Sequence, residues 1–271
     1  MTASLLILTD FFHTANRALR YAAGLAAPLR ARLVLLHVRP ELPDDGAGEG
    51  ELSNLNEEAV RLALGCLADD LAVPAAVEVG RGSVAAAVAD SVRRHHPALV
   101  VLGRSHPRPD AAEPVVATSL ELLRTAAYPM LVVPHEVVAA HPPRRVLLAA
   151  DGDAFTLGEH AGTARHLLNS LRAELTVLGV GRTEPEAALD RALESVARTG
   201  LTIDLPPMRG RAAVAADVAE GILQAARGGE YELLVLVARR RSFWGQLFHR
   251  SVTARVLLGS PLPVLLLPAQ E

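Results

Sequence analysis

The chain repeats one pattern of apolar runs and turns twice along its 271 residues. Three segments recur in the same order in both halves: LLILTD (5–10) and VLLAAD (146–151), VVLGR (100–104) and VLVAR (235–239), and PMLVVP (129–134) and PVLLLP (263–268). A Gly-Arg pair that precedes an Ala/Val-rich stretch also recurs, at Gly80-Arg81 and Gly210-Arg211. One unit has been duplicated, and each copy is long enough to bury its own core. We predict a first domain over 1–139 and a second over 144–271, with a boundary near Pro142-Pro143.

Each copy alternates apolar strands with helices. The expected strands are 5–9, 33–38, 75–80, 99–103 and 130–134 in the first half, and 176–180, 201–205, 232–237 and 264–268 after the first strand of the second half. The expected helices of the first half are 14–27, 55–71, 83–95 and 118–127. Because the strands are continuous apolar runs, they are typical of parallel sheets covered on both faces. The predicted fold is α/β: two tandem, open, five-stranded parallel-sheet domains with helices on both faces, Rossmann-like, with a ligand crevice at the carboxyl ends of the strands.

Several polar residues are expected to begin or end these helices. Thr14 is a candidate N-cap, and two pairs, Thr156 with Glu159 and Thr183 with Glu186, have capping-box spacing. Gly200 is expected to close the second of these helices. The segment 40–54 is rich in Gly, Pro and acids, which predicts a long solvated loop. Cys66 lies within a helical apolar pattern and is expected in the core.

Composition excludes several classes of function. All 27 cationic side chains are arginine, so no lysine is present to grip phosphate in a P-loop, form a Schiff base or act as a general base. The net charge of −3 and the lack of a basic domain argue against nucleic acid as a partner. The histidines show no metal spacing, and the apolar runs are too short to span a membrane. A single cysteine and an N-terminus unlike a signal peptide predict a cytoplasmic protein.

The order of these motifs resembles the universal stress protein family, in a tandem member with two such domains. The carriers are an apolar strand that ends in Asp, a strand that ends in His-Val, a Gly-Arg pair before a helix, VVLG-Arg, and a closing Pro-x-LVVP, and the resemblance covers both halves. The resemblance implies an adenine nucleotide alpha hydrolase-like fold and pairing through the last strand. It also implies a stress-response role, in a family of which some members bind ATP and others do not.

Members that bind nucleotide carry a glycine signature after the fourth strand: Gly, two residues, Gly, nine residues, then Gly followed by Ser or Thr. Glycines there let the backbone approach phosphates closely and adopt positive φ. In the first half Gly103 matches the first glycine, but the second falls on His106 and the third on Val116, with Ala117 in place of the hydroxyl residue. We therefore expect this copy not to hold phosphate.

The second half departs from the signature in another way. Ala238, Arg241 and Arg250 replace the three glycines, whereas Ser251 and Thr253 remain. The segment 239–253, RRRSFWGQLFHRSVT, begins with Arg239 and gathers arginines beside a helix start that Ser251 or Thr253 would cap. Two interpretations stay open: a solvated basic loop, or an anion or nucleotide site that uses arginines in place of glycine amides.

The acids at the ends of the first strands, Asp10 and Asp151, match the residue that holds the adenosine end in ATP-binding relatives. The alternative is that each one satisfies loop N–H groups or caps the next helix, as Asp commonly does. Val38 and Val180, at the ends of the second strands, match the position whose backbone lines the adenine pocket. Both are apolar and would be expected there in any case.

The sequence thus predicts a non-enzymatic stress-response module for binding or regulation, with degenerate nucleotide sites and no cofactor or catalytic residue. The alternative is an adenine-nucleotide-binding stress protein with slow ATP hydrolysis. The last strands, 130–134 and 264–268, are expected to pair, so that one chain forms a pseudo-dimer of its two domains. A further homodimer is compatible with the sequence, which gives no sign of it.

Overall fold

The fold is described from a computed structural model, over residues 3–9, 13–39, 49–104, 114–125, 128–138, 141–239 and 251–270. The strands of the first repeat are β1 (Ser4–Leu8), β2 (Arg32–Arg39), β3 (Ala75–Arg81), β4 (Leu99–Arg104) and β5 (Met130–Pro134). Its helices are α1 (His13–Leu29), α2 (Glu49–Asp69), α3 (Val84–His95) and α4 (Pro114–Thr125). Across the described segments, no helix is long and apolar enough to cross a bilayer.

The second repeat follows the same order of strands and helices. Its strands are β6 (Arg145–Ala149), β7 (Glu174–Gly181), β8 (Arg209–Val214), β9 (Leu233–Arg239) and β10 (Val264–Ala269). Its helices are α5 (Ala161–Leu171), α6 (Pro185–Arg198), α7 (Val218–Arg227) and α8 (Val252–Gly259), and a short 3-10 helix (Gly158–His160) precedes α5.

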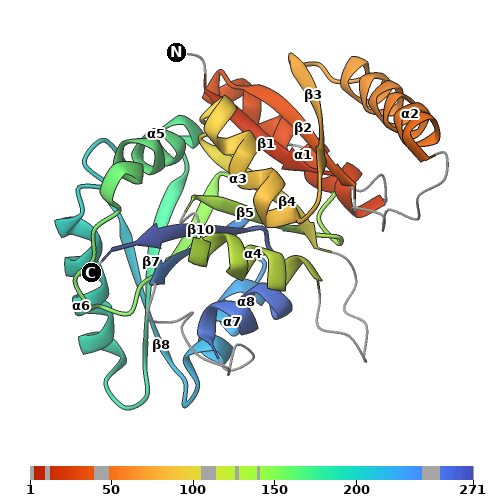
Figure 1. The fold of residues 1–271 in the computed structure, drawn as a ribbon. Helices are drawn as coiled ribbons and strands as arrows, with labels where there is room; N and C mark the ends of the chain where they lie inside the picture. Colours follow the sequence, from red (N-terminus) through yellow and green to blue (C-terminus); the bar gives the residue numbers. More distant parts are fainter. Residues whose placement is uncertain are drawn as a thin grey trace.

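All these strands join one ten-stranded sheet in the order β3-β2-β1-β4-β5-β10-β9-β6-β7-β8. Pairing is parallel within each repeat, and the repeats meet where β5 and β10 pair antiparallel in the middle of the molecule (Figure 1). In this pairing Val132 lies opposite Val264 and Leu131 lies opposite Leu265. The predicted packing of the last strands is therefore confirmed, and each repeat covers the apolar edge of the other.

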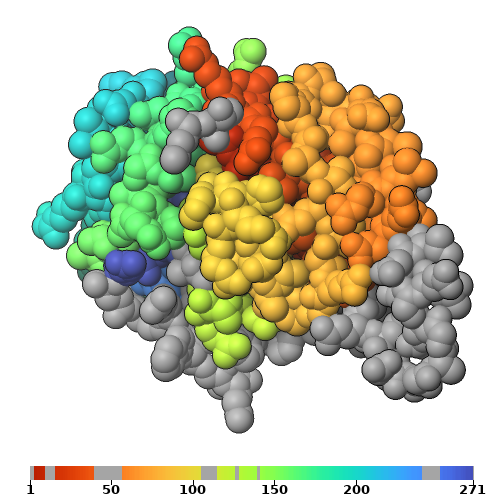
Figure 2. All heavy atoms as spheres, turned by 45° about the horizontal axis from the view of Figure 1, so that its top comes forward, coloured from red at the N-terminus to blue at the C-terminus, as the bar shows by residue number. Residues whose placement is uncertain are grey.

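Helices cover both faces of the sheet and divide its core into two layers. Side chains such as Leu5, Val101 and Leu148 pack with α1, α2, α5 and α6 on one face. Side chains such as Leu6 and Leu236 pack with α3, α4, α7 and α8 on the other face. Because successive residues of a strand point to opposite faces, runs such as Leu99–Leu102 are buried throughout. In the space-filling view the first repeat, in red to yellow, abuts the second, in green to cyan (Figure 2).

Most predicted elements are present, but the segment 201–205 is not the third strand of the second repeat. These residues form turns, and the strand is β8 (Arg209–Val214). Leu201 is buried, so its apolar character reflects packing below the end of α6 and not a place in the sheet. The segment 40–54 is also not a loop throughout, because α2 begins at Glu49.

Several predicted caps are wrong. Helix α1 begins at His13, before Thr14. The backbone of Thr156 forms a bridge with Gln270, and neither the 3-10 helix nor α6 has a side-chain N-cap. Gly200 does follow the end of α6 with φ +67°. Cys66 is exposed on α2 and does not fill the core.

The strand registers change how the two repeats align. Leu5 pairs with Leu99 in the first repeat, and the matching Val146 pairs with Leu233 in the second. From the other side, Met130 pairs with Val100, and the matching Val264 pairs with Leu234. The fourth strands are therefore 134 residues apart and not 135, so Gly103 corresponds to Val237 and Arg104 corresponds to Ala238. The alignment of Gly103 with Ala238 is wrong by one residue.

The recurring Gly-Arg pair is also not equivalent in the two repeats. Gly80-Arg81 ends β3, directly before α3, whereas Gly210-Arg211 lies near the start of β8. The pair therefore does not mark equivalent positions of the two repeats.

Candidate functional site

In the second repeat, the point where strand order reverses lies between β6 and β9. Asp151 follows β6, and Arg239 is the last residue of β9. Their side chains form a two-pronged ion pair, in which Nε of Arg239 donates to Oδ2 of Asp151 at 2.8 Å and Nη2 donates to Oδ1 at 2.7 Å. Such forked pairs are among the strongest that arginine forms.

The same guanidinium also holds the loop that follows β6. Nη1 of Arg239 donates to the carbonyl of Ala154 at 2.9 Å, and Nη2 donates to that of Asp153 at 2.6 Å. Its central carbon lies 5.5 Å from the ring centre of Phe155, within cation–π range. Only 3% of Arg239 is exposed. Arg239 therefore ties the carboxyl end of β9 to residues 151–155 and fills the space between them.

Both carboxylate oxygens of Asp151 are engaged within its own repeat. Besides the two bonds from Arg239, Oδ1 accepts the N–H of Asp153 at 3.1 Å. This arrangement matches the structural alternative for the acid, in which it satisfies a loop N–H. The counterpart in the first repeat, Asp10, lies outside the described residues.

The valines predicted to border the adenine pocket lie at the ends of β2 and β7, as expected, and each is partly buried. Val180 packs closely against α7: a Cβ added at Gly221 would lie 2.7 Å from its Cγ1. Val38 packs against the corresponding core layer of the first repeat. Gly103 lies in β4, partly buried, opposite Val133.

The starts of α4 and α8 differ in a way that bears on phosphate binding. Ser251 caps α8, because its hydroxyl accepts the N–H of Ala254 at 3.0 Å, and Thr253 is buried inside the helix. The counterpart of Ser251 in the first repeat is Ala117. This residue is already the fourth of α4, which begins at Pro114 and not at residue 118 as predicted. The helix is longer by about one turn, in which Val116 is only 6% exposed and packs into the core.

The remaining predicted site residues, Arg241 and Arg250, lie outside the described residues. One buried residue that we did not predict is Arg104, which donates to the carbonyl oxygens of Leu257 and Ser260 across the junction of the repeats. Its only sequence signal is a charged residue at the end of an apolar strand. No group of His, Cys, Asp and Glu that could hold a metal occurs among the described residues.

Comparison with known proteins follows this division into repeats. The family model described as the universal stress protein family matches residues 1–134 and 143–268. The chain belongs to this family. Membership supports a role as a stress-response protein, and the α/β sheet of the tandem repeats agrees with the predicted Rossmann-like, adenine nucleotide alpha hydrolase-like fold.

Solved structures show how widely this fold is shared. A universal stress protein from Archaeoglobus fulgidus is similar with a TM-score of 0.76 at 16% identity, covering 98% of both chains. A putative universal stress protein from Pseudomonas aeruginosa has a TM-score of 0.54 at 18% identity, with 99% of this chain and 94% of that chain covered. The cytoplasmic domain of a prokaryotic cation chloride cotransporter has a TM-score of 0.55 at 12% identity, with 100% and 96% covered. Among curated proteins, no match is found. At these identities the likenesses show the fold alone.

Proposed function

We propose that this universal stress protein acts as a non-enzymatic binding or regulatory module whose second-repeat crevice no longer holds an adenine nucleotide. The main support is the buried Arg239, which occupies both oxygens of Asp151. This acid is the one that would hold the adenosine end in an ATP-binding relative. A cytoplasmic location and the absence of a cofactor are part of the same proposal.

The energetic argument concerns what a nucleotide would have to displace. If the carboxylate of Asp151 turned from Arg239 to accept hydrogen bonds from adenosine, the buried guanidinium of Arg239 would lose its charge partner, which costs about 2–3 kcal/mol because only Asp151 of this pair is half exposed. That cost would weaken nucleotide binding roughly 30- to 150-fold. The pair therefore disfavours the adenosine end, whatever the neighbouring arginines offer to the phosphates.

The first repeat supports the same function through its helix start. The extra turn of α4 places Val116 in the core at the third glycine position and Ala117 inside the helix. Because both residues lie within α4, neither adopts the positive φ on which the glycine signature depends, and the buried side chain of Val116 stands where that signature has a bare backbone. Phosphate binding in the manner of the glycine signature would require the first turn of α4 to unwind in this copy.

ATP binding with slow hydrolysis is the competing function, and thermal unfolding separates the two. Tm is measured with Mg²⁺ alone, and then with Mg²⁺ plus ATP, tripolyphosphate or adenosine at equal concentrations. A ligand present at a hundred times its Kd stabilises a protein by about 2.7 kcal/mol, which is readily measured. We expect adenosine to leave Tm unchanged and ATP to raise it no more than tripolyphosphate does. A larger response to ATP than to tripolyphosphate, or ATP-dependent release of phosphate, would contradict the proposed function.

A further inference from the structure

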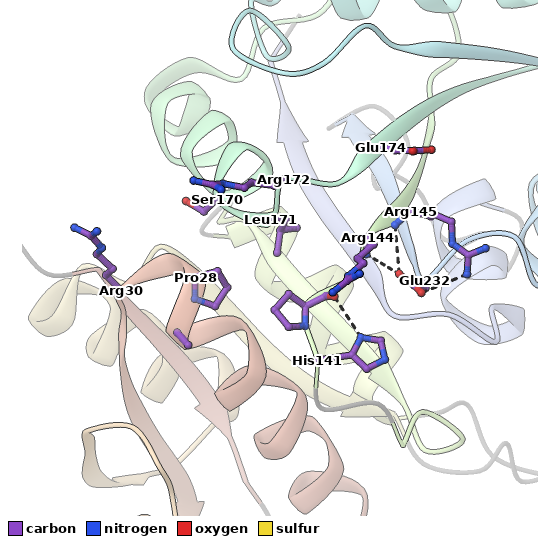
Figure 3. Close-up of a pocket in the computed structure, with 12 residues that line it drawn as sticks. Pro28, Arg30, His141, Arg144, Arg145, Ser170, Leu171, Arg172, Glu174 and Glu232 are labelled. Atoms are coloured by element: carbon purple, nitrogen blue, oxygen red, sulfur yellow. Dashed lines mark hydrogen bonds and ion pairs between the residues drawn. The ribbon is translucent and has the colours of Figure 1, made fainter.

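A cavity of about 1270 Å³ lies at the junction of the two repeats, away from the carboxyl-end crevices. Its walls come from the ends of α1 and α5, from the segment that enters β6, and from the residues before β7 and β9. These are amino ends of strands, whereas Asp151 and Arg239 lie at carboxyl ends. Figure 3 shows Arg30 and Arg172 at the two helix ends on one side of the cavity, and Arg145 with Glu232 on the other.

The charges that line this cavity do not balance. Its acids are already paired: Glu174 with Arg209 of β8 at 3.0 Å, and Glu232 with Arg145 at 3.3 Å. Glu232 also accepts the backbone N–H of Arg144 at 2.6 Å. Within the part of the chain that the structure describes, the guanidinium groups of Arg30, Arg144 and Arg172 have no carboxylate partner.

The helix dipoles reduce this positive charge without cancelling it. The carboxyl ends of α1 and α5 each contribute roughly half a negative charge. Three arginines without a partner carry three positive charges, so a net charge of roughly +2 remains. A dipole explains one cation at each helix end, but it does not explain Arg144, which directly precedes β6.

The backbone at the two helix ends adopts a conformation that is unusual for arginine. Arg30 and Arg172 are equivalent residues of the two repeats, and both have φ near 50°. Glycine is the usual residue in this left-handed conformation, because an L side chain there costs about 1 kcal/mol or more. Both repeats therefore carry a guanidinium at a position where glycine would relieve the backbone, and both guanidiniums border one cavity.

We propose that this cavity binds a compact organic polyanion with two or more phosphate or carboxylate groups. The planar donor fork of arginine matches both groups, and arginine stays charged at any physiological pH. The volume accommodates a molecule of nucleotide size. Because Arg30 belongs to the first repeat and Arg144 and Arg172 belong to the second, the bound anion links the two halves of the chain. This inference goes beyond the proposed function and does not depend on it.

Isothermal titration calorimetry of the full chain tests the site with two probes, tripolyphosphate and citrate. At low ionic strength we expect at least one probe to bind, and its affinity to fall as salt is added. Arg144→Gln and Arg172→Gly should each weaken binding about tenfold, the effect of losing one charge-assisted hydrogen bond. Arg172→Gly suits the left-handed backbone, so lost folding does not account for a lost affinity.

Two matched controls complete the experiment. His96→Gly makes the same left-handed exchange at the end of α3, outside the cavity. Arg124→Gln removes an exposed arginine from α4, on the opposite face of the sheet. Both controls should bind the probe with unchanged Kd. The proposal is overturned if neither probe binds at millimolar concentration, or if a control weakens binding as much as the cavity variants do.

The two probes also distinguish the source of the anion. Tighter binding of tripolyphosphate indicates a phosphorylated ligand, and tighter binding of citrate indicates a polycarboxylate. Adenosine binding would contradict the proposed function but leave this cavity unaffected. Loss of probe binding in Arg144→Gln would support the anion site in the cavity, and it would not bear on the crevice at Asp151.

Discussion

Two buried arginines end the fourth strand of each repeat, β4 and β9, yet they lie on opposite faces of the sheet. Arg104 lies on the face covered by α4 and α8, where it donates to the carbonyl oxygens of Leu257 and Ser260. Arg239 lies on the other face and donates to Asp151 and to the loop that follows it. Buried charge is tolerated only where it is paired and hydrogen-bonded, and both guanidiniums meet this requirement: Arg239 pairs with Asp151, and Arg104 pairs with Glu136 at 3.6 Å besides its two carbonyl acceptors.

Replacing Arg239 should destabilise the protein more than replacing a surface arginine. In Arg239→Met, Asp151 loses its guanidinium donors, and the carbonyl oxygens of Asp153 and Ala154 lose the bonds from Arg239. We expect the free energy of unfolding to fall by about 2–3 kcal/mol, measured by urea denaturation. Arg198→Met, which removes an exposed i,i+4 pair with Glu194 on α6, should cost about 0.5 kcal/mol or less. Equal losses in the two variants would show that Arg239 does not hold the loop.

Glu232 should make stability depend on pH in the acid range. Burial raises the pKa of this carboxyl, but the N–H groups of Arg144 and Arg145 and the guanidinium of Arg145 outweigh burial and lower the pKa below its usual range. A carboxyl whose folded pKa is lowered stabilises the protein above its unfolded pKa of about 4.3, and this stabilisation is lost as the pH falls further.

Glu232→Gln should therefore be less stable than the wild type near neutral pH. The difference in the free energy of unfolding between the two proteins should narrow below about pH 4. Urea denaturation of both proteins at a neutral and an acidic pH provides the measurement. A gap that is constant across this range would mean that the pKa of Glu232 is not lowered. The exposed Glu194→Gln serves as the control, since it removes a solvent-exposed i,i+4 pair with Arg198 and should change the free energy of unfolding little at either pH.

Helix α7 packs on the end of β7 so closely that its fourth residue must be small. A Cβ at Gly221 would lie 2.7 Å from Cγ1 of Val180 and 2.9 Å from Cβ of Ala215. Gly221→Ala should cost about 1–3 kcal/mol by overpacking, as measured by urea denaturation. Gly65→Ala on α2 meets nothing within 4 Å and should instead stabilise the protein by about 0.5–1 kcal/mol. Stabilisation by both exchanges would show that α7 can move away from Val180.

The elements that could be predicted from sequence are those with continuous apolar runs. Strand β5 and strand β10 are buried along their whole length, so their pattern identifies them without ambiguity. Strand β8 was missed because it is an edge strand with exposed Arg209 and Gly210, whereas the apolar segment 201–205 nearby looks more like a strand. The local pattern of apolar residues reveals a strand only where its side chains are buried, and an edge strand buries few of them.

The candidate site was harder to predict because it depends on register. Aligning VVLGR with VLVAR makes Arg239 the counterpart of Arg104. The strand pairing shifts this alignment by one residue, so that Ala238 is the counterpart of Arg104. A shift of one residue turns a strand's side chains to the other face of the sheet. Asp151 was recognised as a candidate from its place after β6, but its partner could be identified only once β6 and β9 were seen as neighbours.

At the scale of the whole molecule, the antiparallel pairing of β5 and β10 converts two domains into one sheet. The cores of both repeats continue across this junction, since Leu131 and Leu265 share one layer while Val132 and Val264 share the other. Arg104 adds a polar link, from the end of β4 to the end of α8. Within the described residues the only strands left at an edge are β3 and β8. The two repeats are therefore expected to unfold together.

Removing the polar link should affect the repeat that does not contain the substitution. In Arg104→Met the carbonyl oxygens of Leu257 and Ser260, at the end of α8, lose their donor. We expect faster amide hydrogen exchange in α8 of the second repeat, and a loss of about 2–3 kcal/mol in the free energy of unfolding. Arg124→Met, an exposed exchange in the first repeat, should leave exchange in α8 unchanged. If Arg104→Met speeds exchange only within the first repeat, Arg104 stabilises its own domain and does not couple the two.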